Sequence, residues 1–381
     1  MKILLVNDNQ QRVGGTEVYV ESLAEHLSMQ GHEVRFYYGS SSYSDSVRRR
    51  TFLSIYLNRI FSFKHLASFK KVVKDFHPDV IHLHNIFNEI SPSILLGTGS
   101  VPVVMTLHDN CIVQAVFDQM MRSGHRCKNE VCPGCANCVG VKGMIYEKIK
   151  RFVHHFLLQN IKAFIAPSKY LQNIVASNSS HRPEQIYNGF ALPKPLPFIS
   201  NFTAIFIGRL TDDKGVDTLI DAVPKILYQI PDFKLLVAGK GVSAEELKDQ
   251  VKKLKIQDSV SFLGSLSKAD VFENLKSSSL VVVPSNWPEN LPTVCVEALS
   301  SGKPIVATQV GGIPEIVEHN ENGILVAPHN PDLLSKAITD LLTDTIKLKK
   351  FSDHGARSVK KFEIEQHLVN ITRIYTRVIH T

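Results

Sequence analysis

Short runs of β-branched and apolar residues alternate along the chain with longer stretches in which apolar residues recur at helical spacing. The helical stretches include residues 16–30 and a basic segment at 51–76. This alternation is typical of parallel sheets covered by helices on both faces, so we predict an α/β fold. The expected strands are residues 3–6, 33–37, 80–83, 101–106 and 163–166 in the first half, and 203–207, 234–238, 259–263, 280–283, 304–307 and 324–326 in the second.

A proline-rich stretch separates the two halves. Residues 191–199 contain three prolines and are interpreted as a linker between domains at 1–190 and 198–360. The tail from about 357 to 379 is helical, and we expect its last part, 361–381, to pack back on the first domain. Ligands of open parallel sheets bind at the carboxyl ends of the strands, so the loops that follow the strands are the candidates for function.

Composition and length agree with a chain that buries a large core. The 381 residues are 44% hydrophobic and 21% charged, which excludes global disorder. No apolar run reaches the roughly 18 residues of a membrane-spanning helix. The strand-like run that begins at Ile3 leaves no room for a signal peptide, so we expect a cytoplasmic protein.

The net charge of +7 is carried entirely by the first half, because residues 191–381 contain acidic and basic side chains in equal number. The basic residues are densest at 45–74, where phenylalanines lie between them. A basic face with apolar anchors suits an anionic membrane surface, which predicts a peripheral location on the inner face of the cell membrane. A solvated amphipathic helix packed on its own domain remains the alternative. The phenylalanines are Phe52, Phe61, Phe63 and Phe69.

The loop after strand 203–207 has the composition of a phosphate site. It reads Gly-Arg-Leu-Thr-Asp-Asp-Lys-Gly from Gly208 to Gly215 and leads into a helical run. The glycines allow the backbone to approach a ligand closely. Arg209 and Lys214 add cations at a helix entrance, where amide donors already favour anions. Alternatively, these two cations are simply solvated at a turn.

Two carboxylates follow strand 280–283. Glu289 falls in the loop and Glu297 on the next predicted helix, so both can contact one extended ligand. A carboxylate accepts hydrogen bonds from vicinal hydroxyls of a ribose or hexose, and the amides of Asn290 and Leu291 at the expected helix start can bind phosphate. Taken singly, each acid is equally explained by the helix dipole or by solvent exposure.

Taken together, the motifs of residues 201–330 closely resemble the donor half of the family-4, GT-B-fold retaining glycosyltransferases. The first half matches more loosely. The resemblance implies two Rossmann-like domains facing each other across a cleft, an acceptor-side domain at 1–190 and a nucleotide-sugar domain at 198–360. The motifs are Gly208-Arg209…Lys214, Pro284-Ser285, Glu289-x7-Glu297, Gly302–Val306, Gly311–Glu315 and Asn322–Val326, with Gly14–Glu17, Thr106–Asp109, Ala166–Ser168 and Asn188-Gly189 in the first half.

The resemblance also implies roles for single residues. Arg209 and Lys214 would hold the diphosphate of a UDP- or GDP-sugar and stabilise the leaving group, and Glu297 would bind the ribose hydroxyls. Glu289, helped by the amides of Asn290 and Leu291, would orient the donor sugar. Many relatives have Gly-Phe-Gly where this chain has Asn290-Leu-Pro, which leaves the contacts to the sugar hydroxyls open.

On the first domain, Gly15 would lie against the donor or acceptor and His108 would reach the transferred sugar. His82 and His84 alternate along strand 80–83, which puts them on one face; we interpret them as structural or acceptor-side residues.

The mechanism expected from this family needs no metal ion and no protein nucleophile. Fixed cations and helix-start amides stabilise the departing diphosphate, and retention is explained by attack of the acceptor on the face that the phosphate leaves. The predicted enzyme is a hexosyltransferase that acts on a glycan or lipid-linked acceptor in surface polysaccharide or glycolipid synthesis.

Four cysteines form a second pattern, Cys127-x4-Cys132-x2-Cys135-x2-Cys138. Four thiols in twelve residues can close a structural zinc site, although reduced thiols or an iron–sulfur spacing are alternatives. Similar cysteine-bearing loops occur in some exopolysaccharide transferases of the family. Cys111 and Cys295 are expected to be packing residues.

Other functions fit less well. A nucleotide-sugar epimerase or a phosphorylase-like enzyme would share the GT-B fold. A zinc-containing nucleic-acid-binding protein is disfavoured, because the cysteine segment is poor in Lys and Arg and the second half is neutral. A dinucleotide oxidoreductase is disfavoured because no Gly-x-Gly-x-x-Gly follows the first strand.

Overall fold

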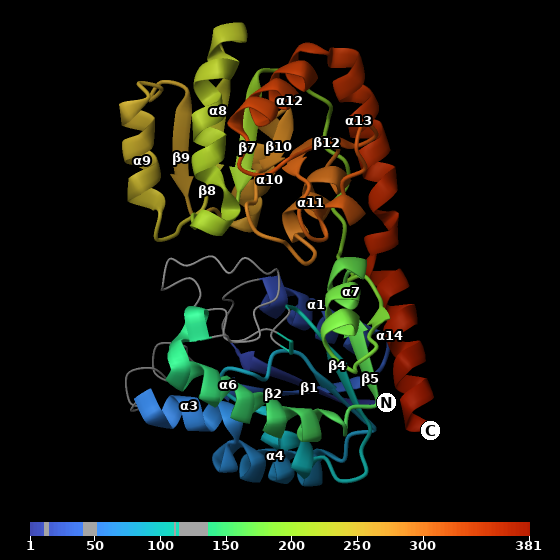
Figure 1. Ribbon diagram of the computed structural model, residues 1–381. Helices are drawn as coiled ribbons and strands as arrows, with labels where there is room; N and C mark the ends of the chain where they lie inside the picture. Colours follow the sequence, from blue (N-terminus) through green and yellow to red (C-terminus); the bar gives the residue numbers. More distant parts are fainter. Residues whose placement is uncertain (11–14, 41–51, 110–111, 114–135) are drawn as a thin grey trace. The chain divides into compact units, whose positions relative to one another are not determined.

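The computed structural model describes residues 1–381 except 11–14, 41–51, 110–111 and 114–135. The chain divides into two compact units. Unit 1 contains Met1–Phe190 and Ile364–Thr381, and unit 2 contains Ala191–Glu363. Each unit is built on a six-stranded parallel sheet with helices on both faces, as the alternating pattern predicts (Figure 1).

The sheet of unit 1 has the strand order β2-β1-β3-β4-β5-β6. All five predicted strands are present, with β1 and β2 extending further than expected, and the short β6 was not predicted. The chain order reverses between β1 and β3, which makes their carboxyl ends the switch point of this sheet. The strands are β1 (Lys2–Asn9), β2 (Glu33–Ser40), β3 (Val80–Leu83), β4 (Val103–Thr106), β5 (Ala163–Ala166) and β6 (Glu184–Gln185).

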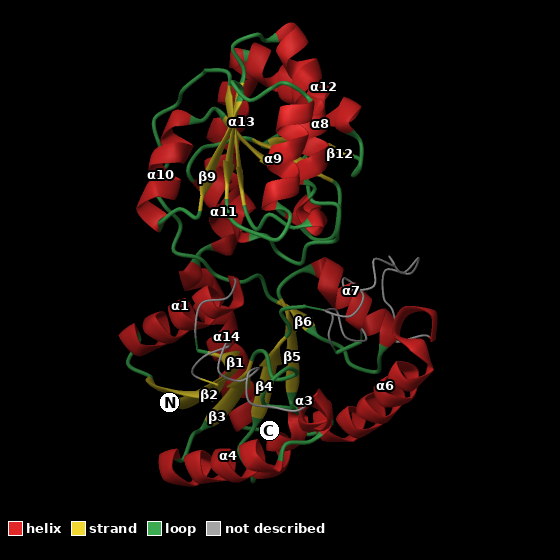
Figure 2. Cartoon of the chain, turned by 90° about the vertical axis from the view of Figure 1, so that its left-hand side faces the viewer, coloured by secondary structure: helices red, strands yellow, loops and turns green. Residues whose placement is uncertain are grey.

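A different set of helices covers each face of this sheet. One face packs against α4, α6 and α7, and the other against α1 and the C-terminal helix α14 (Figure 2). Tyr375 of α14 and Leu23 of α1 are fully buried in this second layer. The helices are α1 (Gly15–Met29), α3 (Phe52–Ile60), α4 (Phe63–Phe76), η1 (Pro92–Gly97), α6 (Ala136–Leu158), α7 (Lys169–Asn178) and α14 (Ile364–Ile379).

The basic segment predicted as helical at 51–76 forms two helices, α3 and α4, rather than one continuous helix. The break falls at Ser62, whose hydroxyl accepts a hydrogen bond from the amide of His65 and caps α4. Phe69 of α4 is fully buried in the core and is therefore unavailable as a membrane anchor, whereas Phe63 is exposed.

Unit 2 has the strand order β12-β11-β10-β7-β8-β9, and its switch point lies between β7 and β10. Its core is built on the face covered by α8, α9 and α12. The strands are β7 (Thr203–Ile207), β8 (Lys234–Ala238), β9 (Val260–Gly264), β10 (Leu280–Val283), β11 (Ile305–Thr308) and β12 (Gly323–Val326). The helices are η2 (Asp212–Lys214), α8 (Val216–Gln229), α9 (Ala244–Lys253), α10 (Lys268–Ser277), α11 (Thr293–Ser300), η3 (Ile313–Glu315), α12 (Pro331–Thr343), α13 (Thr345–Ser358) and η4 (Val359–Phe362).

The predicted helical tail at 357–379 is also interrupted. Helix α13 ends at Ser358, the short η4 follows, and α14 begins at Ile364. The interruption allows α13 to belong to unit 2 and α14 to unit 1.

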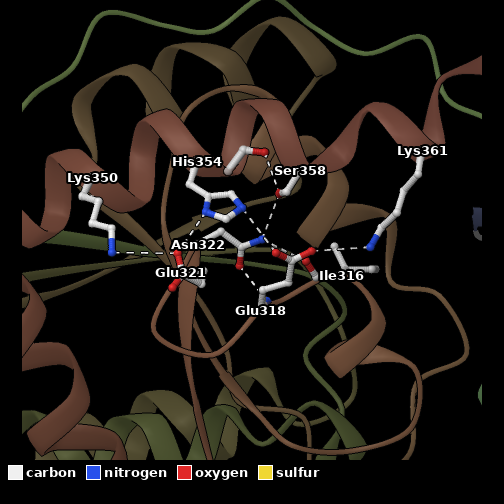
Figure 3. Close-up of polar contacts among 9 residues, drawn as sticks. Ile316, Glu318, Glu321, Asn322, Lys350, His354, Ser358 and Lys361 are labelled. Atoms are coloured by element: carbon white, nitrogen blue, oxygen red, sulfur yellow. Dashed lines mark hydrogen bonds and ion pairs between the residues drawn. The ribbon is translucent and has the colours of Figure 1, made fainter.

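A polar cluster fixes the segment between η3 and β12 to α13 (Figure 3). The imidazole of His354 lies 3.3 Å from a carboxylate oxygen of Glu318 and 3.2 Å from one of Glu321. The buried side chain of Asn322 donates to the carbonyl of Ile316 at 3.1 Å and to the hydroxyl of Ser358 at 2.9 Å. These contacts hold in place the chain that leads out of the glycine-containing loop 311–315.

Candidate functional site

The two loops that carry the predicted donor residues lie side by side at the switch point of unit 2. Strands β7 and β10 are adjacent and parallel, so the loops after Ile207 and Val283 leave the same edge of the sheet. The amide of Asn286 donates to the carbonyl of Asp213 at 2.8 Å, which joins the loops directly. This is the edge at which open parallel sheets bind their ligands.

Gly215 is required for this close approach. Its φ of +66° lies in the left-handed region, and a Cβ atom there would come within 2.0 Å of the carbonyl oxygen of Pro284. Any other residue would push the loop after β7 away from the loop after β10. The glycine therefore sets the position of Lys214, the residue before it.

The side chains of Lys214 and Glu289 meet between these loops. The Lys214 ammonium lies 2.5 Å from Oε1 of Glu289, and the hydroxyl of Ser285 donates to the same oxygen at 2.7 Å. The side chains of Lys214 and Glu289 are only 19% and 18% exposed. A pair held this closely needs little rearrangement to present its charges to a ligand.

The backbone of Glu289 is fixed from its other side by the loop after β11. The amide of Gly312 donates to the carbonyl of Glu289 at 2.7 Å. Gly311 has a φ of +55°, and a Cβ atom on it would lie 2.2 Å from the same carbonyl oxygen. Three loops thus converge on Glu289. Ser285 and the segment Gly311–Glu315 belong to motifs that are visible in the sequence, but this supporting role is apparent only from the structure.

The other predicted donor residues lie around this pair in different environments. Arg209 is 67% exposed and lies 3.8 Å from the carboxylate of Asp213. Asn290 and Leu291 precede α11, which begins at Thr293 after the N-cap residue Pro292. The expectation that they supply helix-start amides is therefore wrong; they are loop residues, and Leu291 is buried.

Glu297 lies on α11, open to solvent on one side. Burial by the surrounding protein nevertheless raises the pKa of its carboxyl, and the positive charge of Lys268 acts in the opposite direction. A carboxylate that is accessible and still partly desolvated favours hydrogen-bond donors such as sugar hydroxyls. Lys268, at the first position of α10, was not singled out from the sequence.

In unit 1, His108 follows β4 and contacts His84. Nε2 of His108 lies 3.1 Å from Nδ1 of His84, and the pKa of His108 is lowered to about 3 by burial. The rings of His82 and His84 are 4.3 Å apart, which confirms that these two side chains share one face. Burial and the neighbouring His108 and His367 lower the pKa of His82 to about 3.

This histidine cluster is tied to the C-terminal helix. Nδ1 of His82 lies 2.6 Å from the hydroxyl of Tyr375, and its Nε2 lies 2.7 Å from the hydroxyl of Thr106. The hydroxyl of Tyr19 on α1 lies 2.8 Å from Nε2 of His367 on α14. His82 is therefore a structural residue, while the half-buried His108 lies at the outer end of the cluster.

Gly15 is the first residue of α1 and is exposed. The four-cysteine pattern lies outside the described residues: Cys127, Cys132 and Cys135 are not described, nor is the side chain of Cys138 at the start of α6, and Cys111 is also undescribed. Cys295 is fully buried, which confirms its packing role, and burial raises the pKa of its thiol.

The fold and the switch-point site define the class of protein. Solved structures similar over nearly the whole chain include a sucrose-phosphate synthase from Thermosynechococcus elongatus (TM-score 0.75, 18% identity, 100% of this chain and 99% of that chain). Another is a protein from Anabaena solved in complex with UDP-glucose (TM-score 0.72, 20% identity, 99% and 100%). The fold is that of the GT-B glycosyltransferases, with two Rossmann-like α/β units.

Family comparisons identify the chain more closely. The model of glycosyl transferases group 1 matches residues 194–358, and that of glycosyltransferase family 4 matches residues 13–192. An uncharacterised glycosyltransferase of Methanocaldococcus jannaschii is 27% identical over 98% of each chain. A phosphatidyl-myo-inositol mannosyltransferase of Mycobacterium tuberculosis is 23% identical over 79% of this chain and 74% of its own. The chain is a glycosyltransferase of the family-4 type.

Proposed function

We propose that this chain is a retaining, metal-independent hexosyltransferase that uses a nucleotide-diphosphate sugar and acts on a glycan or lipid-linked acceptor. The observation that carries the proposal is the Lys214–Glu289 pair, held by three loops at the switch point of unit 2. The similarity to structures that contain UDP and UDP-glucose supports a UDP-sugar as donor. A GDP-sugar is the alternative donor.

The charges of the site suit the departure of a nucleoside diphosphate. Breaking the sugar–phosphate bond develops negative charge on the diphosphate, and a fixed cation stabilises that charge without reorganisation. Lys214 supplies a partly buried cation, and the exposed Arg209, which lies 3.8 Å from the carboxylate of Asp213, supplies a second one for a bound diphosphate. Glu289 keeps Lys214 in place and orients hydroxyls of the donor sugar; it is not the nucleophile.

The remaining residues have supporting roles in this proposal. Glu297 binds the ribose hydroxyls, and the loop residues Asn290 and Leu291 line the diphosphate. His108 acts on the transfer step, and Gly15 allows the backbone of unit 1 to approach a substrate.

We also propose that the enzyme takes part in the synthesis of a surface polysaccharide or glycolipid, working at the inner face of the cell membrane. The similarity to a relative named as a phosphatidyl-myo-inositol mannosyltransferase supports a lipid-linked acceptor. Within the described residues, none of the helices combines the length and the apolar character needed to cross a bilayer. We also propose a structural zinc ion on Cys127, Cys132, Cys135 and Cys138, which metal analysis of the purified chain tests directly.

A thermal-shift panel of nucleoside diphosphates and nucleotide sugars tests the proposal. One nucleotide should stabilise the wild type, and Lys214→Ala should remove most of that stabilisation. Turnover of the stabilising donor without acceptor would instead favour a nucleotide-sugar epimerase. If none of the nucleotides stabilises the wild type, the donor assignment is wrong.

A further inference from the structure

Helix α6 presents a continuous apolar stripe on its outer face. After a break at Gly140, the helix runs without interruption to Leu158. Five large hydrophobic side chains along it are each 51% to 66% exposed, and their spacing of three or four residues places them on one face. They are Val141, Ile145, Ile149, Phe152 and Phe156.

The opposite face of α6 is the one that packs on unit 1. The ring of Tyr146 lies against that of Tyr56, and its hydroxyl donates to the carbonyl of Tyr56 at 3.1 Å. Leu157 and Leu158 are buried in the core. Single exposed hydrophobic residues are ordinary, but five in a row on one helix mark an interaction surface.

Cations border this stripe, and acids are absent from it. Lys142 and Lys148 are exposed on either side, and the partly exposed Arg151 lies beyond Lys148. The one acid between Gly140 and Leu158, Glu147, is on the buried face, where Lys150 lies 2.7 Å from its carboxylate. An apolar centre with basic borders is the pattern of helices that lie in the interface of an anionic bilayer.

We infer that the outer face of α6 is a docking surface for an anionic phospholipid membrane. A second copy of the chain fits less well, because the basic borders of two such stripes would repel each other. The inference rests on the proposed function, since it supplies a contact with the membrane that would hold a lipid-linked acceptor. It differs from the sequence prediction, which placed the membrane surface at 45–74, where Phe69 is buried.

Co-sedimentation of the full chain with phospholipid vesicles tests the inference. One set of vesicles is phosphatidylcholine alone, and the other contains about a third phosphatidylglycerol. The wild type should bind the anionic vesicles and leave the neutral ones largely unbound. The double variant Phe152→Ser/Phe156→Ser should lower the affinity by about tenfold or more, because the apolar area that enters the lipid is lost.

Three further double variants locate the surface. Val242→Ser/Ile346→Ser removes two highly exposed hydrophobic side chains of unit 2 and should bind like the wild type. Lys142→Glu/Lys148→Glu should weaken binding to the anionic vesicles, whereas Lys71→Glu/Lys74→Glu on α4 should have a smaller effect. If the α4 variant loses binding while the phenylalanine variant keeps it, the docking surface is on α4 and the inference is wrong.

Melting temperature, molar mass and nucleotide binding are measured on the same variants. The phenylalanine variant should melt like the wild type, because exposed side chains contribute little to folding. A large fall in the melting temperature of this variant would mean that another part of the chain covers the stripe. If the wild type is a dimer and this variant is a monomer, a second copy of the chain covers the stripe. Either result overturns the inference. Retained nucleotide binding in this variant separates membrane docking from the proposed function.

Discussion

Lys214 and Glu289 are 75 positions apart in the chain, and their side chains meet at 2.5 Å where the loops after β7 and β10 converge. The hydroxyl of Ser285 binds the same carboxylate oxygen, and the backbone of Gly312 holds the Glu289 carbonyl. A cation that is largely withdrawn from water is costly unless an acid neutralises it. Glu289 therefore holds the Lys214 ammonium in position before a diphosphate arrives.

Replacing Lys214 with Ala should weaken the binding of the donor's nucleoside diphosphate by about tenfold to a hundredfold, since a hydrogen bond to a charged group contributes about 1.5–3 kcal/mol. Isothermal titration calorimetry measures this change. Lys225→Ala is the matched control, because Lys225 lies on α8 of the same unit and pairs with Asp332 at the surface. Equal affinities of the wild type and Lys214→Ala would rule out a diphosphate contact.

Glu289→Gln should reduce kcat by about tenfold or more, because the carboxylate is proposed to orient the donor sugar. The affinity for the free nucleoside diphosphate should change less, because the carboxylate is not proposed to bind the nucleotide. Steady-state kinetics with the donor, alongside titration with the nucleotide, separates these effects. Ser285→Ala should show the same pattern to a smaller degree, since the Glu289 carboxylate keeps its contact with Lys214. A loss of nucleotide binding equal to the loss of kcat would contradict the orienting role.

The strands that build this site could be predicted from the sequence, because residues 203–207 and 280–283 are unbroken apolar, β-branched runs. The pairing of Lys214 with Glu289 could not, since it depends on β7 and β10 being neighbours although two strands separate them in the chain. The start of α11 was placed too early because the sequence does not show that Pro292 is the N-cap.

The histidine cluster illustrates the same limit in unit 1. Alternation along β3 correctly placed His82 and His84 on one face. Their partners are far away in sequence: Tyr375 lies on the last helix of the chain, and His108 follows the neighbouring strand. Periodicity gives the direction of a side chain within one element, and only the packing of elements determines what it contacts.

Glu297→Ala should raise the KM for the donor by about tenfold, because the ribose hydroxyls lose a charged acceptor.

The affinity of the wild type for the donor should also fall on acidification. Burial raises the pKa of the Glu297 carboxyl, so the carboxylate that accepts the hydroxyls is protonated at a higher pH than an ordinary glutamate. Donor titrations of the wild type and of Glu297→Ala over the acidic range check this. An identical pH dependence in both proteins would exclude Glu297 as its cause.

His108→Ala should slow turnover by about tenfold to a hundredfold and leave nucleotide binding by unit 2 nearly unchanged. His84→Asn should lower kcat less, because His84 contacts His108 at 3.1 Å and acts only by positioning it. His26→Ala, on the last turn of α1, is the control for loss of a histidine outside the cluster. Normal turnover of His108→Ala would show that its assignment to the transfer step is wrong.

The buried histidines should make the folded chain sensitive to acid. Burial lowers the pKa of His82 and His108 to about 3 and that of His367 to about 4, whereas the unfolded chain takes up these protons near an ordinary histidine pKa of about 6.5. Between those values the unfolded state binds more protons, so the stability present above about pH 6.5 is lost as the pH falls.

Asp8 acts in the opposite direction over part of this range. Burial raises the pKa of the Asp8 carboxyl to about 6, although three backbone amides that donate to its carboxylate act in the opposite direction. The contribution of Asp8 to the free energy of unfolding is therefore lost as the pH rises through about 6. Three histidines outweigh one aspartate, and the free energy of unfolding should therefore fall from about pH 6.5 toward pH 4.5. Urea denaturation at several pH values measures this, and His367→Gln should flatten the dependence. A stability that stays constant or rises on acidification would show that the cluster is not held neutral in the folded state.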